Sequence, residues 1–124
     1  MRPFLWLAIA ITLSGPSYAG GLPTDLKTKL QSAMISYVDN IVVDGSYRYV
    51  DAKSGSFTTV YPANVHPIVL TAGADFFVCS EMINEEGDTV TADFLVREIE
   101  GAYRVVQMIV NDRASVKSAV NKLN

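Results

Sequence analysis

Three apolar segments of strand length follow one another in the second half of the chain. They span residues 75–84, 88–99 and 102–111, and Glu85–Gly87 and Glu100–Gly101 join them. Glycine supplies the positive φ angle that tight hairpin turns need, so each joint favours a hairpin. The three segments therefore predict an antiparallel meander, around which the rest of the fold has to be arranged.

Apolar side chains occupy both faces of this predicted meander. If each joint is a two-residue turn ending in glycine, Cys79 lies opposite Phe94 and Arg97 lies opposite Arg104. The first face then carries Phe77, Cys79, Ile83, Val90, Ala92, Phe94, Val96, Val105 and Ile109. The second face carries Phe76, Val78, Met82, Leu95, Val106, Met108 and Val110. A sheet with one solvated face would alternate apolar and polar residues. We therefore expect the second face to be covered by the C-terminal helix, another chain or a ligand.

Helices are predicted before and after the strands. The first begins at Thr24, whose hydroxyl suits an N-cap, and ends near Val42–Asp44, ahead of Gly45. Its apolar stripe consists of Leu26, Leu30, Ala33, Met34, Tyr37 and Ile41. Asp112 is a suitable cap for the last helix, whose stripe consists of Val116, Ala119, Val120 and Leu123. We expect the long first helix to pack on the first sheet face.

Shorter extended segments lie between the first helix and the meander. Residues 47–50 and 56–61 have the two-residue period of strands and predict a hairpin. Pro62 and Pro67 bracket a segment that is either a loop or an edge strand, and residues 68–71 form a short strand. Together these patterns predict an α+β domain. In it, a long N-terminal helix packs on a curved antiparallel meander of four to six strands, and a short C-terminal helix follows.

The start of the chain has the pattern of a cleavable export signal. Arg2 precedes an apolar run, Phe4–Leu13, and Gly15–Pro16 ends that run. Ser17 and Ala19 are small residues at the two positions that signal peptidases recognise. The run is far shorter than the roughly 20 apolar residues that a membrane-spanning helix needs. We therefore expect cleavage after Ala19.

This expectation divides the chain into a signal peptide, residues 1–19, and a single domain, residues 20–124. The domain is expected to be periplasmic or secreted, without stable membrane insertion. Its Lys and Arg residues are scattered and the chain has a formal net charge of −3, which excludes a typical nucleic-acid binder. The single cysteine, Cys79, lies in an apolar segment, so we expect a buried and unreactive thiol.

The predicted order of a long helix and a curved antiparallel meander resembles the cystatin-like and NTF2-like folds. The inhibitory Gln-x-Val-x-Gly hairpin of cystatins is missing, because Gln107–Val110 lacks the glycine. This argues against a cysteine-protease inhibitor of the usual kind. The resemblance to NTF2-like proteins implies either a dimer formed through the open sheet face or a pocket between helix and sheet. Fold similarity does not choose between these.

Six residues are candidates for ligand binding: Asp93, Arg97, Arg104, His66, Tyr47 and Tyr49. Asp93 lies in an apolar strand, where a carboxylate is costly unless it is paired. It is either a site carboxylate or half of a surface ion pair with Arg97. Arg97 and Arg104 face each other, which indicates either a small anion clamp or a bulge that alters the register.

His66 is the only histidine, and no second His and no nearby Cys accompany it, so we predict no metal site and no catalytic residue. Tyr47 and Tyr49 share a strand face and line either the edge of the core or a ligand cleft. No cofactor is expected. The sequence thus favours a non-enzymatic module that dimerises or binds a protein partner through the sheet face. The alternative is an NTF2-like small-molecule binder or enzyme with a pocket between helix and sheet.

Overall fold

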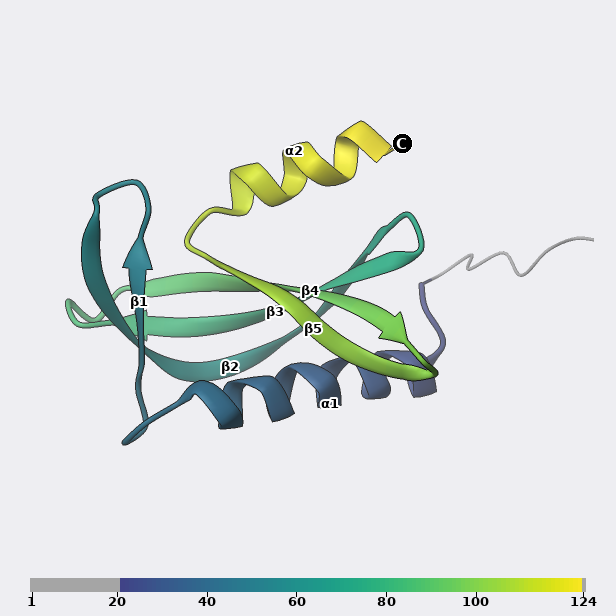
Figure 1. Ribbon diagram of the computed structural model, residues 1–124, viewed down its shortest axis with the longest axis horizontal. Helices are drawn as coiled ribbons and strands as arrows, with labels where there is room; N and C mark the ends of the chain where they lie inside the picture. Colours follow the sequence, from purple (N-terminus) through teal and green to yellow (C-terminus); the bar gives the residue numbers. More distant parts are fainter. Residues whose placement is uncertain (1–20, 124) are drawn as a thin grey trace, which may run out of the picture.

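The computed structural model describes residues 21–123, and the predicted signal peptide, residues 1–19, lies outside them. The described chain folds into an α+β domain, as the sequence predicts. Its elements are, in order, α1 (Thr24–Ile41), β1 (Tyr47–Asp51), β2 (Ser56–Ala72), β3 (Asp75–Asn84), β4 (Thr89–Ile99), β5 (Ala102–Val110) and α2 (Arg113–Leu123). The two helices lie on opposite faces of the sheet (Figure 1).

The five strands form one antiparallel sheet in which each strand pairs with the next along the chain. The predicted meander is confirmed, and its strand number lies within the expected range. The sheet is not closed, so β1 and β5 are its two edge strands. Figure 1 shows that β2 is strongly bent. The bend carries β1 out of the plane of the central strands.

The proline-containing segment, residues 62–67, is an edge strand rather than a loop. It belongs to β2, which continues to Ala72 and takes in the short strand expected at 68–71. β1 pairs only with Ser56–Val60. Within the described chain, β2 therefore has a free edge from Tyr61 onward. Proline lacks the N–H that a neighbouring strand would need, so it suits such an edge.

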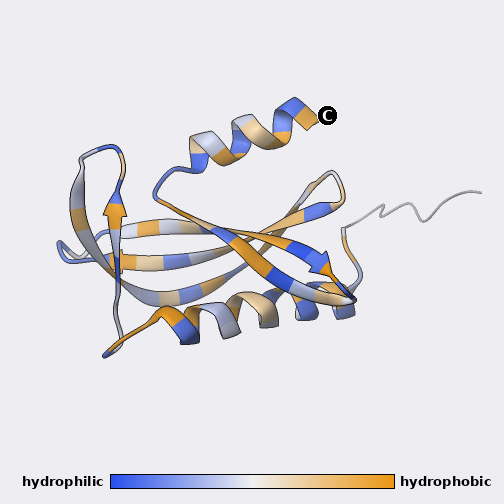
Figure 2. Cartoon of the chain, in the orientation of Figure 1, coloured by the Kyte–Doolittle hydropathy of each residue, from blue (hydrophilic) through white to orange (hydrophobic). Residues whose placement is uncertain are grey.

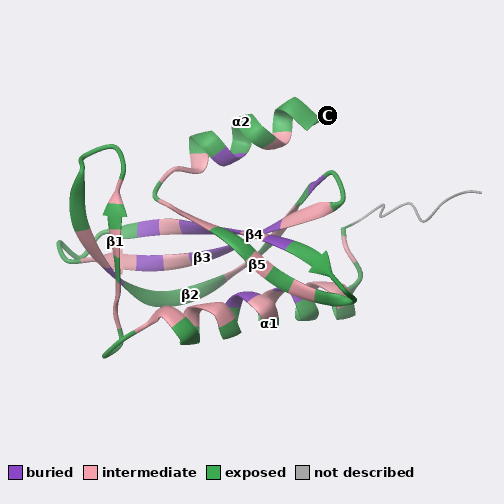
Figure 3. Ribbon diagram, in the orientation of Figure 1, coloured by how far each residue is buried: buried purple, intermediate pink, exposed green. Residues whose placement is uncertain are grey.

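The main hydrophobic core lies between α1 and the sheet. The predicted apolar stripe of α1 faces the strands, and Leu30 and Met34 are almost completely buried. The ring of Tyr37 meets that of Phe94 edge-on, with centroids 6.0 Å apart, a favourable geometry for aromatic pairs. The buried strand residues of this core are Val60, Val78, Met82, Val90, Ala92, Phe94 and Val96. Buried positions concentrate in β3 and β4, the central strands (Figure 3).

The first turn of α1 differs from the expected one. Thr24 lies inside the helix, and Pro23, whose side chain has no hydrogen-bonding group, occupies the N-cap position. The hydroxyl of Thr28 donates to the carbonyl oxygen of Thr24 at 2.9 Å. The helix ends at Ile41, next to the predicted end.

α2 covers part of the second sheet face and is attached mainly through its first turns. Val116 is fully buried and packs with Ala72 and Phe77, whereas Leu123 is 61% exposed. Polar and apolar residues alternate along α2 (Figure 2), and most of the helix is exposed (Figure 3). One of the three predicted covers for this face, the C-terminal helix, is therefore present.

The predicted register of the first hairpin is wrong by one residue. Phe94 pairs with Val78, and Cys79 pairs with Asp93. The N–H of Asn84 donates to the carbonyl of Asp88 at 2.9 Å, which leaves a three-residue loop between them instead of a two-residue turn. Because strand side chains alternate, this shift moves every residue of β3 to the other face. Val78 therefore faces α1, and Cys79 faces α2.

The second hairpin has the predicted register only near its turn. Arg97 pairs with Arg104 as expected. A bulge then lies between the pairs Leu95–Gln107 and Val96–Val105, so one residue of β5 has no opposite neighbour. The bulge places Met108 and Val110 on the face of α1. The same bulge places Ile109 on the face of α2.

Candidate functional site

A cleft of about 410 Å³ lies between the two edge strands of the sheet. We term it the tyrosine cleft. Its size falls in the range of ordinary small-molecule sites. Its lining consists of Tyr47, Tyr49, Val50, Asp51, Ala52, Lys53, Met108, Ile109, Val110, Asn111 and Asp112. One wall is therefore β1 with its hairpin turn, and the other is the end of β5 with the joint to α2.

Two of the six predicted site residues, Tyr47 and Tyr49, form the aromatic wall of this cleft. They are two positions apart on β1 and therefore point to the same face, toward α1. Their rings are nearly parallel, with an interplanar angle of 5° and centroids 5.8 Å apart. Partial burial raises the pKa of both phenols above the usual value. Both tyrosines are therefore neutral at physiological pH.

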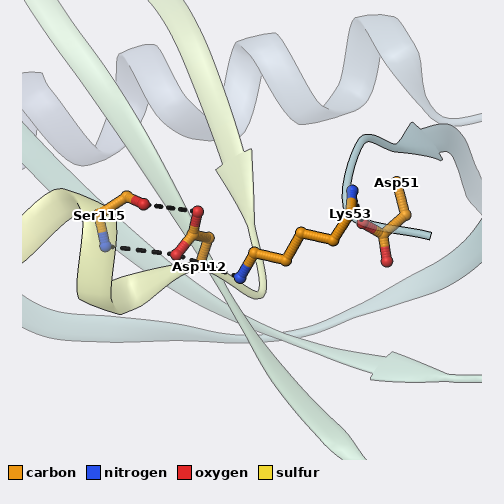
Figure 4. Close-up of polar contacts among 4 residues, drawn as sticks. All are labelled: Asp51, Lys53, Asp112 and Ser115. Carbon is orange, nitrogen blue, oxygen red and sulfur yellow. Dashed lines mark hydrogen bonds and ion pairs between the residues drawn. The ribbon is translucent and has the colours of Figure 1, made fainter. Parts of the chain in front are cut away.

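An ion pair joins the two walls of the tyrosine cleft (Figure 4). Lys53 Nζ lies 3.3 Å from Asp112 Oδ1. Asp112 also caps α2 as predicted, because Ser115 donates its hydroxyl at 2.7 Å and its N–H at 3.3 Å to the carboxylate. These hydrogen bonds from Ser115, together with Lys53, lower the pKa of Asp112. Asp51 is the third charged residue here and accepts the N–H of Lys53 at 2.9 Å.

Asp93 belongs to a separate cluster on the face of α2 and does not line the tyrosine cleft. It is completely buried. Its Oδ1 lies 3.2 Å from Arg113 Nη1 and accepts the thiol of Cys79 at 2.9 Å. The expected surface ion pair with Arg97 is wrong, because Arg97 bonds Asp75 at 3.1 Å instead. Asp93 and Arg97 are four residues apart on one strand, a separation of roughly 13 Å along it.

Cys79 is a buried thiol, as predicted. Burial, and then the neighbouring Asp93, raise its pKa to about 12. The sequence shows no cation near Cys79, yet Arg113 Nη1 lies 3.1 Å from its sulfur. Arg113 is 34 residues away along the chain and reaches Cys79 only because α2 folds back over the sheet. No local pattern in the sequence could have revealed this residue.

The three remaining predicted residues do not meet in one site. Arg97 and Arg104 are paired across their hairpin, but the guanidinium of Arg97 is already bound to Asp75, which argues against a free anion clamp. His66 is half-buried in β2. Its Nδ1 is buried and finds no hydrogen-bond partner among the described residues. None of the three lines the tyrosine cleft.

The polar cleft residues that the sequence does not indicate as site residues are Asp51, Lys53, Asn111 and Asp112. The sequence indicates Asp112 only as a helix cap, and Lys53 lies in a hairpin turn that carries no motif. Across residues 21–123, no group of three or more His, Cys, Asp or Glu side chains is arranged to hold a metal ion. Neither helix of this part of the chain is long and apolar enough to cross a membrane. In comparisons with known proteins, the chain matches no family model, no curated protein and no solved structure.

Proposed function

We propose that this protein is an exported, non-enzymatic binding module that holds a small ring-containing ligand in the tyrosine cleft. The observation that carries the proposal is the pair of parallel tyrosine rings in the wall of an open cleft. Flat aromatic side chains bury much apolar area and favour stacking on a second ring. The polar groups that line the cleft, on Lys53, Asp51 and Asp112, supply the few hydrogen bonds that orient a ligand.

Two features support binding rather than catalysis. The single cysteine and the single histidine of the chain, Cys79 and His66, do not line the cleft. Asp112, one of the acidic residues that line the cleft, has a lowered pKa. Its carboxylate already accepts hydrogen bonds from Ser115 and forms an ion pair with Lys53. A general acid at neutral pH needs the opposite, a raised pKa.

The proposal shares with the second alternative from the sequence a small-molecule binder, but its cleft lies between the two edge strands and not between helix and sheet. Export remains part of the proposal and rests on the pattern of residues 1–19.

Amide chemical-shift titration of the ¹⁵N-labelled protein tests the proposal. The probes are p-cresol, benzoate, benzylamine, glucose and N-acetylglucosamine. We expect at least one probe to give saturable shifts in β1 and at the end of β5, and a Tyr49→Ala variant to lose them. Tyr61→Ala is the matched control, because Tyr61 is 43% exposed and lies outside the cleft. If all five probes leave the β1 and β5 signals unmoved, the proposal is wrong.

Self-association through the sheet is a second candidate function, favoured by an exposed apolar patch on the outer face of the β1–β2 hairpin. α2 leaves this part of the second face open. Val50 is 59% exposed and its cross-strand partner Phe57 is 66% exposed. The guanidinium of Arg48 lies 4.1 Å from the centroid of the Phe57 ring. Aromatic and Arg side chains are enriched at the centres of protein interfaces.

Sedimentation velocity distinguishes this second function. A self-associating protein sediments as a dimer at micromolar concentration, and Phe57→Ser returns it to a monomer. Leu123→Ser is the control, because Leu123 is similarly exposed but lies at the end of α2. A wild-type protein that stays monomeric across the concentration range removes this candidate and leaves the tyrosine cleft unaffected.

A further inference from the structure

The polar rim of the tyrosine cleft restricts the class of ligand that it can take. Lys53 contributes an ammonium group whose side chain is 68% exposed. An ammonium has three N–H donors, and the ion pair with Asp112 Oδ1 occupies one of them. Lys53 therefore has donors left for a ligand.

The same rim of the cleft also carries hydrogen-bond acceptors. A carboxylate accepts through two oxygens, and Asp51 uses Oδ1 for the backbone N–H of Lys53. Asn111 lines the cleft beside Asp112 and adds an amide, which both donates and accepts. The rim thus mixes donors and acceptors, and it mixes one positive with two negative charges.

This mixture disfavours a ligand with a single charge. An anion drawn to the Lys53 ammonium would lie next to Asp112, and a cation drawn to Asp112 would meet Lys53. Like charges at such short range cost free energy, which offsets the attraction. A neutral ring that carries several hydroxyl groups avoids this conflict, because each hydroxyl both donates and accepts.

The aromatic wall selects for the same kind of molecule. The stacked rings of Tyr47 and Tyr49 form an aromatic wall beside the polar rim. A sugar ring has a C–H face that is apolar and an edge of hydroxyl groups that is polar. We propose that the ligand of the tyrosine cleft is a neutral sugar unit, with its C–H face on the tyrosines and its hydroxyls on Lys53, Asp51 and Asn111. This inference rests on the proposed function and names its ligand class.

The five-probe titration separates the two proposals when two neutral sugar chains, maltotriose and triacetylchitotriose, are added. The inference expects saturable shifts with the neutral sugars and none with benzoate or benzylamine. If p-cresol or a charged probe binds and no sugar does, the sugar proposal is wrong while the proposed function stands. If nothing binds, both are wrong. A trisaccharide that binds more tightly than its single sugar identifies a glycan chain as the source, and equal binding identifies a free sugar.

Variants test the two halves of the site separately. Tyr49→Ala is expected to weaken sugar binding by about tenfold, the size of one aromatic contact, and Tyr49→Phe is expected to restore it because the ring is kept. Lys53→Met removes the donors without touching the core, so it carries the test if Tyr49→Ala does not fold. Tyr61→Ala should bind like the wild type. Sugar binding that survives both Tyr49→Ala and Lys53→Met would overturn the assignment.

Discussion

Asp93, Cys79 and Arg113 show how this protein buries a carboxylate in the middle of a sheet. A buried charge is tolerated when it is paired and hydrogen-bonded. Oδ1 of Asp93 forms an ion pair with the Arg113 guanidinium and accepts a hydrogen bond from the Cys79 thiol. Oδ2 is buried and has no hydrogen-bond partner among the described residues. The side chain of Arg113 is 30% exposed, so only one end of the pair is fully removed from water. The carboxylate therefore depends on Arg113 more than on any other contact.

Removing Arg113 should destabilise the protein far more than removing Arg97. Breaking a buried pair leaves an uncompensated charge, and Arg113→Ala is expected to cost about 3 kcal/mol, the low end for such pairs because Arg113 is partly exposed. Arg97→Ala breaks the exposed pair with Asp75 and should cost less than about 1 kcal/mol. Urea unfolding of the two variants measures the difference. Equal losses would contradict the buried role of Asp93.

The raised pKa of Cys79 predicts a loss of stability at alkaline pH. The thiol has a pKa of about 12 in the folded protein, against 9.0 as its ordinary value, because burial disfavours the thiolate. Its contribution is therefore complete below about pH 9 and is lost as the pH rises toward 12, by at most about 1.4 kcal/mol per pH unit. Tyr47 and Tyr49 act in the same direction, but only above about pH 10, since their pKa values are also raised.

Urea unfolding at about pH 8 and pH 10 measures this effect, with Cys79→Ala as the reference. The wild type should lose stability between these pH values, and Cys79→Ala should lose little. The folded wild type should also react slowly with a thiol reagent at neutral pH. Equal pH dependence in both proteins would show that the thiol titrates normally.

The burial of Cys79 could be predicted from the sequence, but its partners could not. An apolar strand segment is enough to indicate a buried thiol. The face on which that thiol lies depends on the length of a loop, and the nearest cation comes from a helix 34 residues away. Neither the face of the sheet on which Cys79 lies nor its cationic neighbour is determined by the residues next to it in the sequence. The sequence can therefore indicate that Cys79 is buried without indicating which residues surround it.

At the scale of elements, α2 is held by few contacts for a helix that covers a sheet face. Val116 is its buried anchor, and Arg113 and Asp112 fix its first turn. Most of its remaining surface is exposed (Figure 3). Local opening free energies are smallest where few apolar groups are buried. α2 is therefore expected to open before the sheet unfolds.

Val116→Ala should loosen α2, at a cost of about 2 kcal/mol for the buried methyl groups and the cavity left behind. Because Cys79 lies under the start of α2, its reaction with a thiol reagent should accelerate in parallel. Leu123→Ala is the control and should change neither quantity, since Leu123 is 61% exposed. A faster thiol reaction in both variants would mean that opening starts at the end of α2 and not at its anchor.

The order and type of the elements could be predicted from sequence, while the register could not. Hydrophobic periodicity and glycine positions are local signals, so they located the helices and the meander. Loop length is also local, but Glu85–Gly87 fits both a two-residue and a three-residue loop. The hydrogen bond between Asn84 and Asp88 selects the longer one. With both sheet faces apolar, the sequence pattern carries no penalty for the wrong choice.

At the scale of the whole molecule, the tyrosine cleft arises from how the two ends of the sheet approach each other. β1 and β5 are far apart in the sequence and are not paired. The bend of β2 brings the hairpin turn of β1 to the start of α2, where Lys53 bonds Asp112. Tyr47 and Tyr49 could be nominated from their shared face. The opposite wall could not, because it depends on a bend that no single segment encodes.

Processing of the N-terminus is testable on the whole chain. When the full sequence is expressed in a bacterium, we expect the protein in the periplasm or the medium to begin at Gly20, as measured by intact mass. Ala19→Arg should block cleavage, because signal peptidases need a small residue at that position. Exported protein that keeps residues 1–19 would contradict the predicted cleavage site.

The two prolines on the free edge of β2 also govern how copies of this chain behave toward one another. An unprotected strand edge is a template onto which another extended chain can add, and repeated addition builds a fibre. Pro62 and Pro67 carry no N–H to donate, and the register shifts near them break the alignment of this segment. Strand addition at this edge therefore has no uninterrupted row of donors to follow. The residues that interrupt β2 thus hinder polymerisation from its longest exposed edge.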